Sequence, residues 1–282
     1  MSSLKHKVIT GVFWQALEKI GSRGITFVVS LVLARLLTPD DFGLLAMLAI
    51  FLTVSGVLVD SGLGTALIQK ESVSDVDYNS AFYLSLVFSI ILYGVLFACA
   101  PAIASFYERP VLCPVLRWAA LGVIFYAVNG VQLAVLKRTM KFNLSFRISL
   151  AETVSYAIIG ITLALRGYGV WALVFATLGS LVIATAVRWF LIGWTPGLAF
   201  SFSAIRTMFQ YSGKLLASAI LNTFFANLYG LVIGKVYSSS ALAFYNRGRA
   251  LPQTGVDMVK ASVANVTFSA FSSLQNDRQQ LR

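Results

Sequence analysis

The sequence has very few charged residues. Only 12% of its 282 residues are charged, whereas 58% are hydrophobic, and the mean hydropathy is +0.80. A soluble domain carries about a quarter charged residues, so a soluble globular protein is excluded. Apolar runs of about 20 residues, the length that crosses a bilayer as a helix, recur along the chain. The composition therefore predicts an all-α polytopic membrane protein.

Residues that bind metals or act in catalysis are also scarce. The chain has one histidine, His6, and two cysteines, Cys99 and Cys113. A zinc site with Cys and His ligands is excluded by this count, and His6 is far from either cysteine in the sequence. The cysteines flank one predicted helical hairpin, so a disulfide is an alternative to the two free thiols that we favour. No phosphate-binding loop or GxSxG motif is present, and we expect no metal, no cofactor and no enzymatic activity.

The formal net charge is +11. No basic and aromatic domain is present to dock a duplex, so we do not expect nucleic acid as a partner. Basic residues that anchor cytoplasmic loops explain most of the charge. The alternative is that some of them line a path for an anionic substrate.

Eight apolar runs are long enough to span a membrane. They cover residues 9–37, 42–68, 80–105, 112–136, 144–166, 169–194, 208–237 and 241–271. The first is too long for a signal peptide and carries charges, so we interpret it as a retained helix. If the N-terminus lies in the cytoplasm, the basic residues gather on the inner side, as the positive-inside rule requires. These inner residues are Lys70, Lys137, Arg138, Lys141, Arg147, Arg188, Arg206 and Lys214.

The chain contains an internal repeat. The segment "LVLARLLTPDDFGLLA" (31–46) is similar to "LVIGKVYSSSALAFYN" (231–246), at an offset of 231 − 31 = 200 residues. Six helices fit between the copies, so both copies have the same orientation, as in transporters built from parallel repeats. We expect a six-helix N-lobe at 1–200 and the first two helices of an incomplete C-lobe at 201–282, and hence a fragment of a longer transporter. "TPDDFG" itself is expected to form an ordinary outer turn with solvated aspartates.

Polar residues inside the spans are the candidate functional residues, because a charge in hydrocarbon needs a partner or a water-filled path. Gln15, Lys19 and Ser22 share one face of the first helix, with Glu18 and Arg23 beside it. The candidates in later spans are Arg35, Asp60, Glu152, Asn222 and Arg249. Such faces predict a polar cavity, although hydrogen bonds between helices are the alternative. Basic residues near helix ends, Arg188 among them, can instead reach the headgroups.

Three segments resemble a known family. "LARLLTPDDFGLLAM" and "VDSGLGTALIQK" (59–70) resemble the first two helices of bacterial lipopolysaccharide and O-antigen flippases, and "ALAFYNRGRALPQ" (241–253) resembles their eighth helix. These flippases form the polysaccharide transporter family of the multidrug/oligosaccharidyl-lipid/polysaccharide exporter superfamily.

The resemblance implies a function. Such proteins move undecaprenyl-pyrophosphate-linked oligosaccharides across the bacterial inner membrane for lipopolysaccharide or exopolysaccharide assembly. They act beside glycosyltransferases and a glycan polymerase. On this basis Lys19, Arg23 and Arg35 would bind the pyrophosphate, with Gln15, Ser22, Asn222 and Arg249 in the same lumen. Glu18, Asp60 or Glu152 would couple transport to a proton or sodium ion.

Three other functions are considered. A drug-type exporter of the same superfamily would need an acidic lumen, whereas the charged residues inside the predicted spans are mainly basic. A membrane glycosyltransferase or polymerase would need a long outer loop with acid and base residues, and the outer loops are short. A non-transporting membrane scaffold is disfavoured by the polar helix faces.

Overall fold

The computed structural model describes residues 21–22, 24–60, 63–70, 72–139 and 142–249. Within these ranges all regular structure is helical. A first described helix covers Gly24–Leu36. The helices that follow are α2 (Pro39–Asp60), α3 (Leu63–Gln69), α4 (Asp75–Phe106), α5 (Leu112–Ala119), α6 (Leu121–Arg138), α7 (Phe142–Leu165), α8 (Val170–Ile192) and α9 (Phe202–Val236). Residues 239–249 form a further helical segment.

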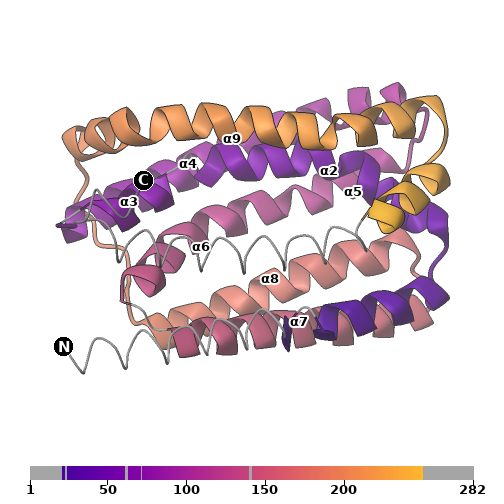
Figure 1. Ribbon diagram of the computed structural model, residues 1–282, viewed down its shortest axis with the longest axis horizontal. Coiled ribbons are helices and arrows are strands. Elements are labelled where there is room, and N and C mark those ends of the chain that lie inside the picture. The colour runs from indigo at the N-terminus through magenta and orange to yellow at the C-terminus, as the bar shows by residue number, and fades with distance from the viewer. Residues whose placement is uncertain (1–20, 23, 61–62, 71, 140–141, 250–282) are drawn as a thin grey trace, which may run out of the picture.

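The helices form one elongated bundle with their axes roughly parallel (Figure 1). Six helical segments in the described part of the chain are long and apolar enough to cross a membrane. They are Pro39–Ile68, Asp75–Phe106, Leu112–Arg138, Asn143–Leu165, Val170–Ile192 and Ser212–Val236. They confirm six of the predicted spans and the all-α membrane class. The predicted spans 9–37 and 241–271 lie partly outside the described residues, and the division into two lobes stays a prediction.

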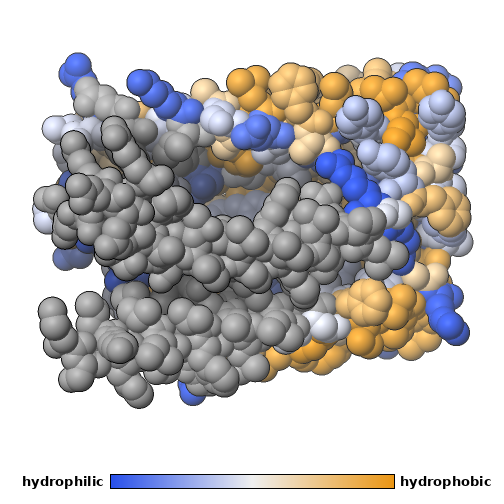
Figure 2. Space-filling model, viewed as in Figure 1, coloured by the Kyte–Doolittle hydropathy of each residue, from blue (hydrophilic) through white to orange (hydrophobic). Residues whose placement is uncertain are grey.

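Close packing holds α7 against α8. A β-carbon at Gly179 would lie 2.5 Å from Ile159 Cδ1, and one at Gly160 would lie 3.2 Å from Ala176 Cβ. Helices come this near only where a side chain is missing, which is the usual way that membrane helices pack. Large apolar side chains remain exposed on the outside, for example Ile91, Val95 and Phe225. Figure 2 shows broad apolar areas on one face, as expected for a surface that faces lipid tails.

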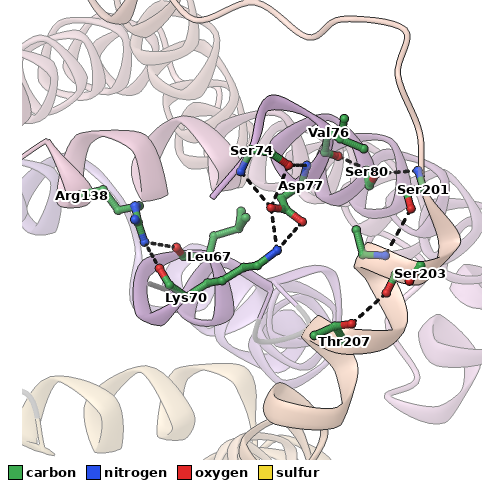
Figure 3. Close-up of polar contacts among 11 residues, drawn as sticks. Leu67, Lys70, Ser74, Val76, Asp77, Ser80, Arg138, Ser201, Ser203 and Thr207 are labelled. Atoms are coloured by element: carbon green, nitrogen blue, oxygen red, sulfur yellow. Dashed lines mark hydrogen bonds and ion pairs between the residues drawn. The ribbon is translucent and has the colours of Figure 1, made fainter. Parts of the chain in front are cut away.

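Two helices begin earlier than the hydropathy predicts, because polar residues cap them. α4 begins at Asp75, not near residue 80, and Ser74 is its N-cap in a capping box with Asp77. α9 begins at Phe202, not near residue 208, and the Ser201 hydroxyl accepts a hydrogen bond from the Ala204 amide. Capping satisfies backbone N–H groups that the helix itself leaves free. Ser80 on α4 also accepts a bond from the Ser201 amide at 2.9 Å, which joins the two helix starts (Figure 3).

Basic residues at this end of the bundle have structural partners. Lys70 Nζ lies 2.7 Å from Asp77 Oδ2, and Asp77 is buried (Figure 3). Arg138 at the end of α6 donates to the carbonyl oxygens of Leu67 and Ile68 at 2.9 and 3.1 Å. A cation suits this place because the last carbonyls of a helix carry partial negative charge. Two of the predicted loop anchors therefore also fix α3 to α4 and α6.

Replacing Asp77 by alanine should destabilise the protein by about 2 kcal/mol, because hydrogen bonds to a charged group contribute about 1.5–3 kcal/mol. The change removes the acceptor for Lys70, the Ser74 amide and the Ser74 hydroxyl. Thermal unfolding of the detergent-solubilised protein measures it. Asp75→Ala is the matched control, because Asp75 lies in the same first turn but is exposed. Equal losses from both variants would contradict the assigned role of Asp77.

The segment "TPDDFG" begins a helix and is not an ordinary turn. Pro39 occupies the first position of α2, where its missing N–H costs nothing. The Thr38 hydroxyl accepts a bond from the Asp41 amide at 3.3 Å, and Asp41 Oδ2 accepts one from the Thr38 amide at 2.9 Å. This reciprocal pair is a capping box. Asp40 and Asp41 both remain partly exposed to solvent, and Asp41 in addition caps the start of the helix.

The helix of the second repeat copy is also capped by a side-chain hydroxyl. The Ser238 hydroxyl accepts a bond from the Ala241 amide at 3.0 Å, so Ser238 caps residues 239–249 as Thr38 caps α2. The two positions are separated by the predicted 200 residues. The start of α2 and the segment 239–249 lie at the same end of the bundle (at the right in Figure 1), where Asp40 accepts a hydrogen bond from Ser239. The two helix starts are thus capped alike, and the division of the chain into two parallel repeats stays a prediction.

Candidate functional site

A cavity of about 900 Å³ lies inside the bundle. It is lined by α2, α3, α6, α7, α8 and α9, and Figure 2 shows a hollow with hydrophilic side chains on its floor. Its volume is in the upper part of the range for ligand pockets, about 300–1,000 Å³. The polar lining residues are Thr53, Asp60, Thr65, Tyr126, Asn129, Glu152, Arg188, Asn222, Thr223 and Asn227. The prediction that polar helix faces enclose a cavity is consistent with this arrangement.

An ion pair crosses the cavity wall between α7 and α8. Arg188 Nη2 lies 3.6 Å from Glu152 Oε2. The arginine side chain is 15% exposed and the glutamate 36%, so both are partly withdrawn from solvent. Arg188 Nε is fully buried with no hydrogen-bond partner in the structure. The pair is long and uses one carboxylate oxygen, which leaves guanidinium N–H groups available to a ligand.

The placement of Arg188 corrects an expectation. We expected this residue at the inner end of a span, where it could reach the headgroups. It instead points inward from α8 and lines the cavity. The cause is Glu152 on the adjacent helix, because a partnered charge inside the bundle avoids the cost of an unpaired one. Sequence reasoning underrated this residue, although its pairing with an acidic residue in the preceding span was a usable signal.

Asp60 lies within the candidate membrane span Pro39–Ile68. α2 ends at Asp60 and α3 begins at Leu63, within the span Pro39–Ile68. The Asp60 carboxylate is exposed to the cavity, and Lys137 is the cation whose charge acts on it. Asp60 is therefore a second acidic group of this cavity.

Amide side chains supply neutral hydrogen-bonding groups. Asn129 Nδ2 donates to Thr185 Oγ1 at 2.9 Å, while its Oδ1 is buried without a partner. Asn222 on α9 donates to Ser218 at 3.5 Å and is exposed to the cavity. Gln132, on the same face of α6 as Asn129, is fully buried and does not line the cavity. Amides of this kind suit the hydroxyl groups of a sugar.

The structure brings together only some of the predicted site residues. Asp60, Glu152 and Asn222 line the cavity. Ser22 instead shares a hydrogen bond of 2.8 Å with Ser149, which joins two helices. Arg35 is exposed and Arg249 donates to the Ala226 carbonyl, and neither lines the cavity. Gln15, Glu18, Lys19 and Arg23 lie outside the described residues, and their roles stay predictions.

The end of the bundle opposite α3 is closed by the two repeat copies. Asp40 accepts a hydrogen bond from Ser239, and Arg109 Nη2 lies 3.4 Å from Asp40 and 3.3 Å from Ser239. The cavity-lining residues belong to the other half of α2, nearer α3. The cavity and these contacts therefore lie toward opposite ends of α2.

A second ion pair supports the closed end. Lys235 Nζ donates to Glu108 Oε1 at 2.8 Å. This hydrogen bond and the lysine charge hold the pKa of Glu108 below its usual range. A lowered pKa means that the pairing is present at neutral pH and is lost as the pH falls through the lowered value. Glu108 is largely exposed, so the contribution of the pair is small.

Comparison with known proteins gives consistent results. The sequence pattern of the family described as polysaccharide biosynthesis protein matches residues 32–282. The lipopolysaccharide biosynthesis protein WzxC of Escherichia coli K12 is 24% identical over 286 residues. The succinoglycan biosynthesis transport protein ExoT of Rhizobium meliloti is 24% identical over 278 residues. The teichuronic acid biosynthesis protein TuaB of Bacillus subtilis is 22% identical over 287 residues.

The similarity extends along this chain but not along the whole of its relatives. It covers 99%, 98% and 100% of the chain, but 57%, 56% and 59% of WzxC, ExoT and TuaB. The chain thus spans little more than half the length of these proteins. No solved structure matches it significantly.

Proposed function

The chain belongs to the polysaccharide biosynthesis protein family, and on that premise we propose that it transfers a lipid-linked oligosaccharide across a membrane. The substrate class is an undecaprenyl-pyrophosphate-linked glycan used for lipopolysaccharide or exopolysaccharide assembly. A transport role is supported by the relative named a succinoglycan biosynthesis transport protein. The proposed activity is movement of an intact substrate and not an enzymatic reaction.

One observation carries the proposal: a polar cavity with a partly buried guanidinium lies inside an apolar bundle of membrane-spanning helices. A pyrophosphate and a glycan cannot enter hydrocarbon without losing their hydration. Arg188 can offset part of that loss by charge-assisted hydrogen bonds to phosphate oxygens. Asn129 and Asn222 can do the same for sugar hydroxyls. Exposed apolar side chains on the outer surface suit the lipid tail, which stays in the bilayer.

The closed end favours an alternating-access mechanism. In such a mechanism one half of the transporter moves against the other around a fixed site. Contacts of Asp40 and Arg109 with Ser239 would have to break for the opposite side to open. With the N-terminus in the cytoplasm, these contacts lie on the outer side, and the cavity lies toward the inner side where the substrate is made. This orientation, and location in a bacterial inner membrane, are parts of the proposal.

Coupling and partners complete the proposal. Glu18, Asp60 or Glu152 would exchange a proton or sodium ion, and Lys19, Arg23 and Arg35 would add positive charge along the substrate path. A glycan polymerase and glycosyltransferases would supply and consume the substrate. These roles follow from the family and from position and charge in the sequence.

A second candidate function is export of a small cationic molecule. It is favoured by the charge of the described cavity lining, which has two carboxylates, Asp60 and Glu152, and one guanidinium, Arg188. The basic lumen expected from the sequence is thus not seen among these residues. Cationic substrates are attracted by such carboxylates.

Deletion of the gene in its source organism separates the two functions. Loss of glycan transport should leave lipid-linked oligosaccharide on the inner leaflet and reduce surface glycan to background, both measurable by lipid extraction and sugar analysis. Loss of a cation exporter should instead increase the accumulation of a cationic dye.

The wild-type gene supplied on a plasmid should restore surface glycan, and the Arg166→Gln variant should restore it equally. Arg166 is the matched control because it is an exposed arginine outside the cavity. Normal surface glycan in the deletion strain, without any accumulated intermediate, would contradict the proposed function.

A further inference from the structure

Tyr126 is the single aromatic side chain among the described residues that line the main cavity. It projects from α6 and is 48% exposed. One edge of its ring packs against α2, since a β-carbon at Gly56 would lie 3.8 and 3.9 Å from Tyr126 Cδ2 and Cε2. Within the described part of the chain, its hydroxyl has no hydrogen-bond partner and no other ring packs against it. The ring is therefore available to a solute in the cavity.

Hydrogen-bonding groups lie beside this ring. The Glu152 carboxylate on α7 is close enough for its charge to act on the Tyr126 hydroxyl. Asp60 and Asn129 line the same cavity. A sugar has weakly polar C–H faces and hydroxyl groups around its edge, so an exposed aromatic ring next to carboxylates and an amide is complementary to it. The same groups would also suit an organic cation, which can lie over an aromatic ring.

Two contacts show that the neighbouring helices α6 and α8 are parallel. A β-carbon at Gly122 would lie 3.4 Å from Leu181 Cδ1. Farther along both helices, Asn129 Nδ2 donates to Thr185 Oγ1 at 2.9 Å. Residue numbers thus increase in the same direction along α6 and α8. The hydrogen bond places Asn129 and Thr185 at the same level of the bundle.

Tyr126 and Arg188 lie on opposite sides of this level. Tyr126 is three residues before Asn129 on α6, and Arg188 is three residues after Thr185 on α8. With a rise of 1.5 Å per residue, their Cα atoms are about 9 Å apart along the bundle. In the proposed substrate the first sugar is joined directly to the pyrophosphate. A pyrophosphate bound at Arg188 therefore brings that sugar to the ring of Tyr126.

We propose that the first sugar of the lipid-linked glycan packs with a C–H face on the ring of Tyr126, while Glu152 and Asp60 accept hydrogen bonds from its hydroxyls. This inference rests on the proposed transport function and deepens it, because it assigns a residue to recognition of the glycan. Many sugars have such a C–H face, so packing on an aromatic ring tolerates different sugars. Tyr126 thus distinguishes a lipid pyrophosphate that carries a glycan from one that carries none.

The experiment compares two soluble probes on the purified full chain in detergent. They are citronellyl pyrophosphate and the same molecule with glucose on its terminal phosphate, and isothermal titration calorimetry measures both dissociation constants. The wild type should bind the glucose-bearing probe about tenfold more tightly, which corresponds to 1.4 kcal/mol. Tyr126→Leu keeps an apolar side chain without the ring. It should reduce the difference to about twofold and leave the affinity for the bare probe unchanged, whereas Tyr126→Phe should retain most of the difference.

Leu133→Ala is the matched control. Leu133 lies on the same face of α6, lines the same cavity and is 40% exposed, and this variant should keep the tenfold difference. Arg188→Gln should weaken the binding of both probes by the same factor, because it acts on the pyrophosphate that they share.

The outcomes separate this inference from the transport proposal. Equal binding of the two probes by the wild type, or a tenfold difference kept by Tyr126→Leu, would overturn the role of Tyr126 and leave the transport proposal standing. Binding of neither probe would overturn both. Binding of the cation tetraphenylphosphonium that depends on Tyr126, without any preference for glucose, would overturn the sugar assignment in favour of the cation exporter.

Discussion

Replacing Arg188 by glutamine should lower glycan export about 10- to 150-fold while the protein still inserts into the membrane. A charge-assisted hydrogen bond contributes about 1.5–3 kcal/mol, and every 1.4 kcal/mol corresponds to a factor of ten in binding. Arg188 is the single cation among the described residues that line the cavity. Its loss removes the group that replaces water around the pyrophosphate. Surface glycan per amount of membrane-inserted protein, in the deletion strain, measures the effect.

Variants of the partner residue distinguish a binding role from a structural one. Glu152→Gln should reduce export less than Arg188→Gln, because the Arg188 guanidinium, without its carboxylate partner, can still bind the pyrophosphate of the substrate. The double variant should resemble Arg188→Gln alone. If Arg188 served only to neutralise Glu152, the double variant would instead recover wild-type export, since neither charge would be left unpaired.

Conservative replacement gives a further test of the same residue. Arg188→Lys should keep part of the activity, because lysine supplies the charge but not the planar, two-pronged geometry that matches phosphate. Wild-type export by Arg188→Gln would remove this residue from the substrate path. Arg166→Gln remains the control for an arginine exposed outside the cavity.

Hydropathy predicted the spans well and their ends poorly. A bilayer requires long apolar helices, so the six described spans could be recognised from the sequence. The starts of α4 and α9 were placed about five residues late, because Ser74, Asp77 and Ser201 are polar and were assigned to loops. Those residues are polar because they cap the helices. Serine and aspartate before an apolar run are a sequence signal for a helix start.

The site could be predicted only in part, because its residues meet through tertiary contacts. Asp60, Glu152 and Asn222 were found because polar residues inside a span are conspicuous. Arg188 was underrated because its position near the end of a span says nothing about its neighbours. It lies in the hairpin of α7 and α8, where Glu152 is at a comparable distance from the tight turn.

The internal repeat stays a prediction, but the structure shows what its two segments have in common locally. Thr38 and Ser238 are equivalent N-caps, which agrees with the offset of 200 residues. The sequence did not reveal that the two copies touch. Contact between segments this far apart depends on the whole bundle, whereas capping is a local property. Gly43 and Asp40 take part in this contact, because both lie against Ser239, whereas Asp41 caps α2.

Replacing Gly43 by alanine should destabilise the protein by about 3 kcal/mol or more, near the upper end of the usual cost of overpacking. A β-carbon at Gly43 would lie 1.9 Å from the Ser239 carbonyl oxygen and 2.7 Å from Ser239 Cα. These are backbone atoms at the capped start of residues 239–249, so no side-chain rotation relieves the overlap. The second repeat copy must move away from α2, which also separates Asp40 and Arg109 from Ser239. Thermal unfolding of the detergent-solubilised protein measures the loss.

Gly94→Ala is the matched control for this substitution. Gly94 lies within α4, and a β-carbon there meets nothing within 4 Å. Alanine in a helix interior is favoured over glycine by about 1 kcal/mol, so this variant should be unchanged or slightly more stable. Gly43 also lies inside a helix, so alanine there gains the same helix propensity as at Gly94. Any loss of stability in Gly43→Ala relative to Gly94→Ala therefore comes from the overlap with Ser239. Equal stability of Gly43→Ala and Gly94→Ala would show that α2 and the second repeat copy are not held in contact at Gly43. The closed end, and with it the alternating-access proposal, would then lose its main structural support.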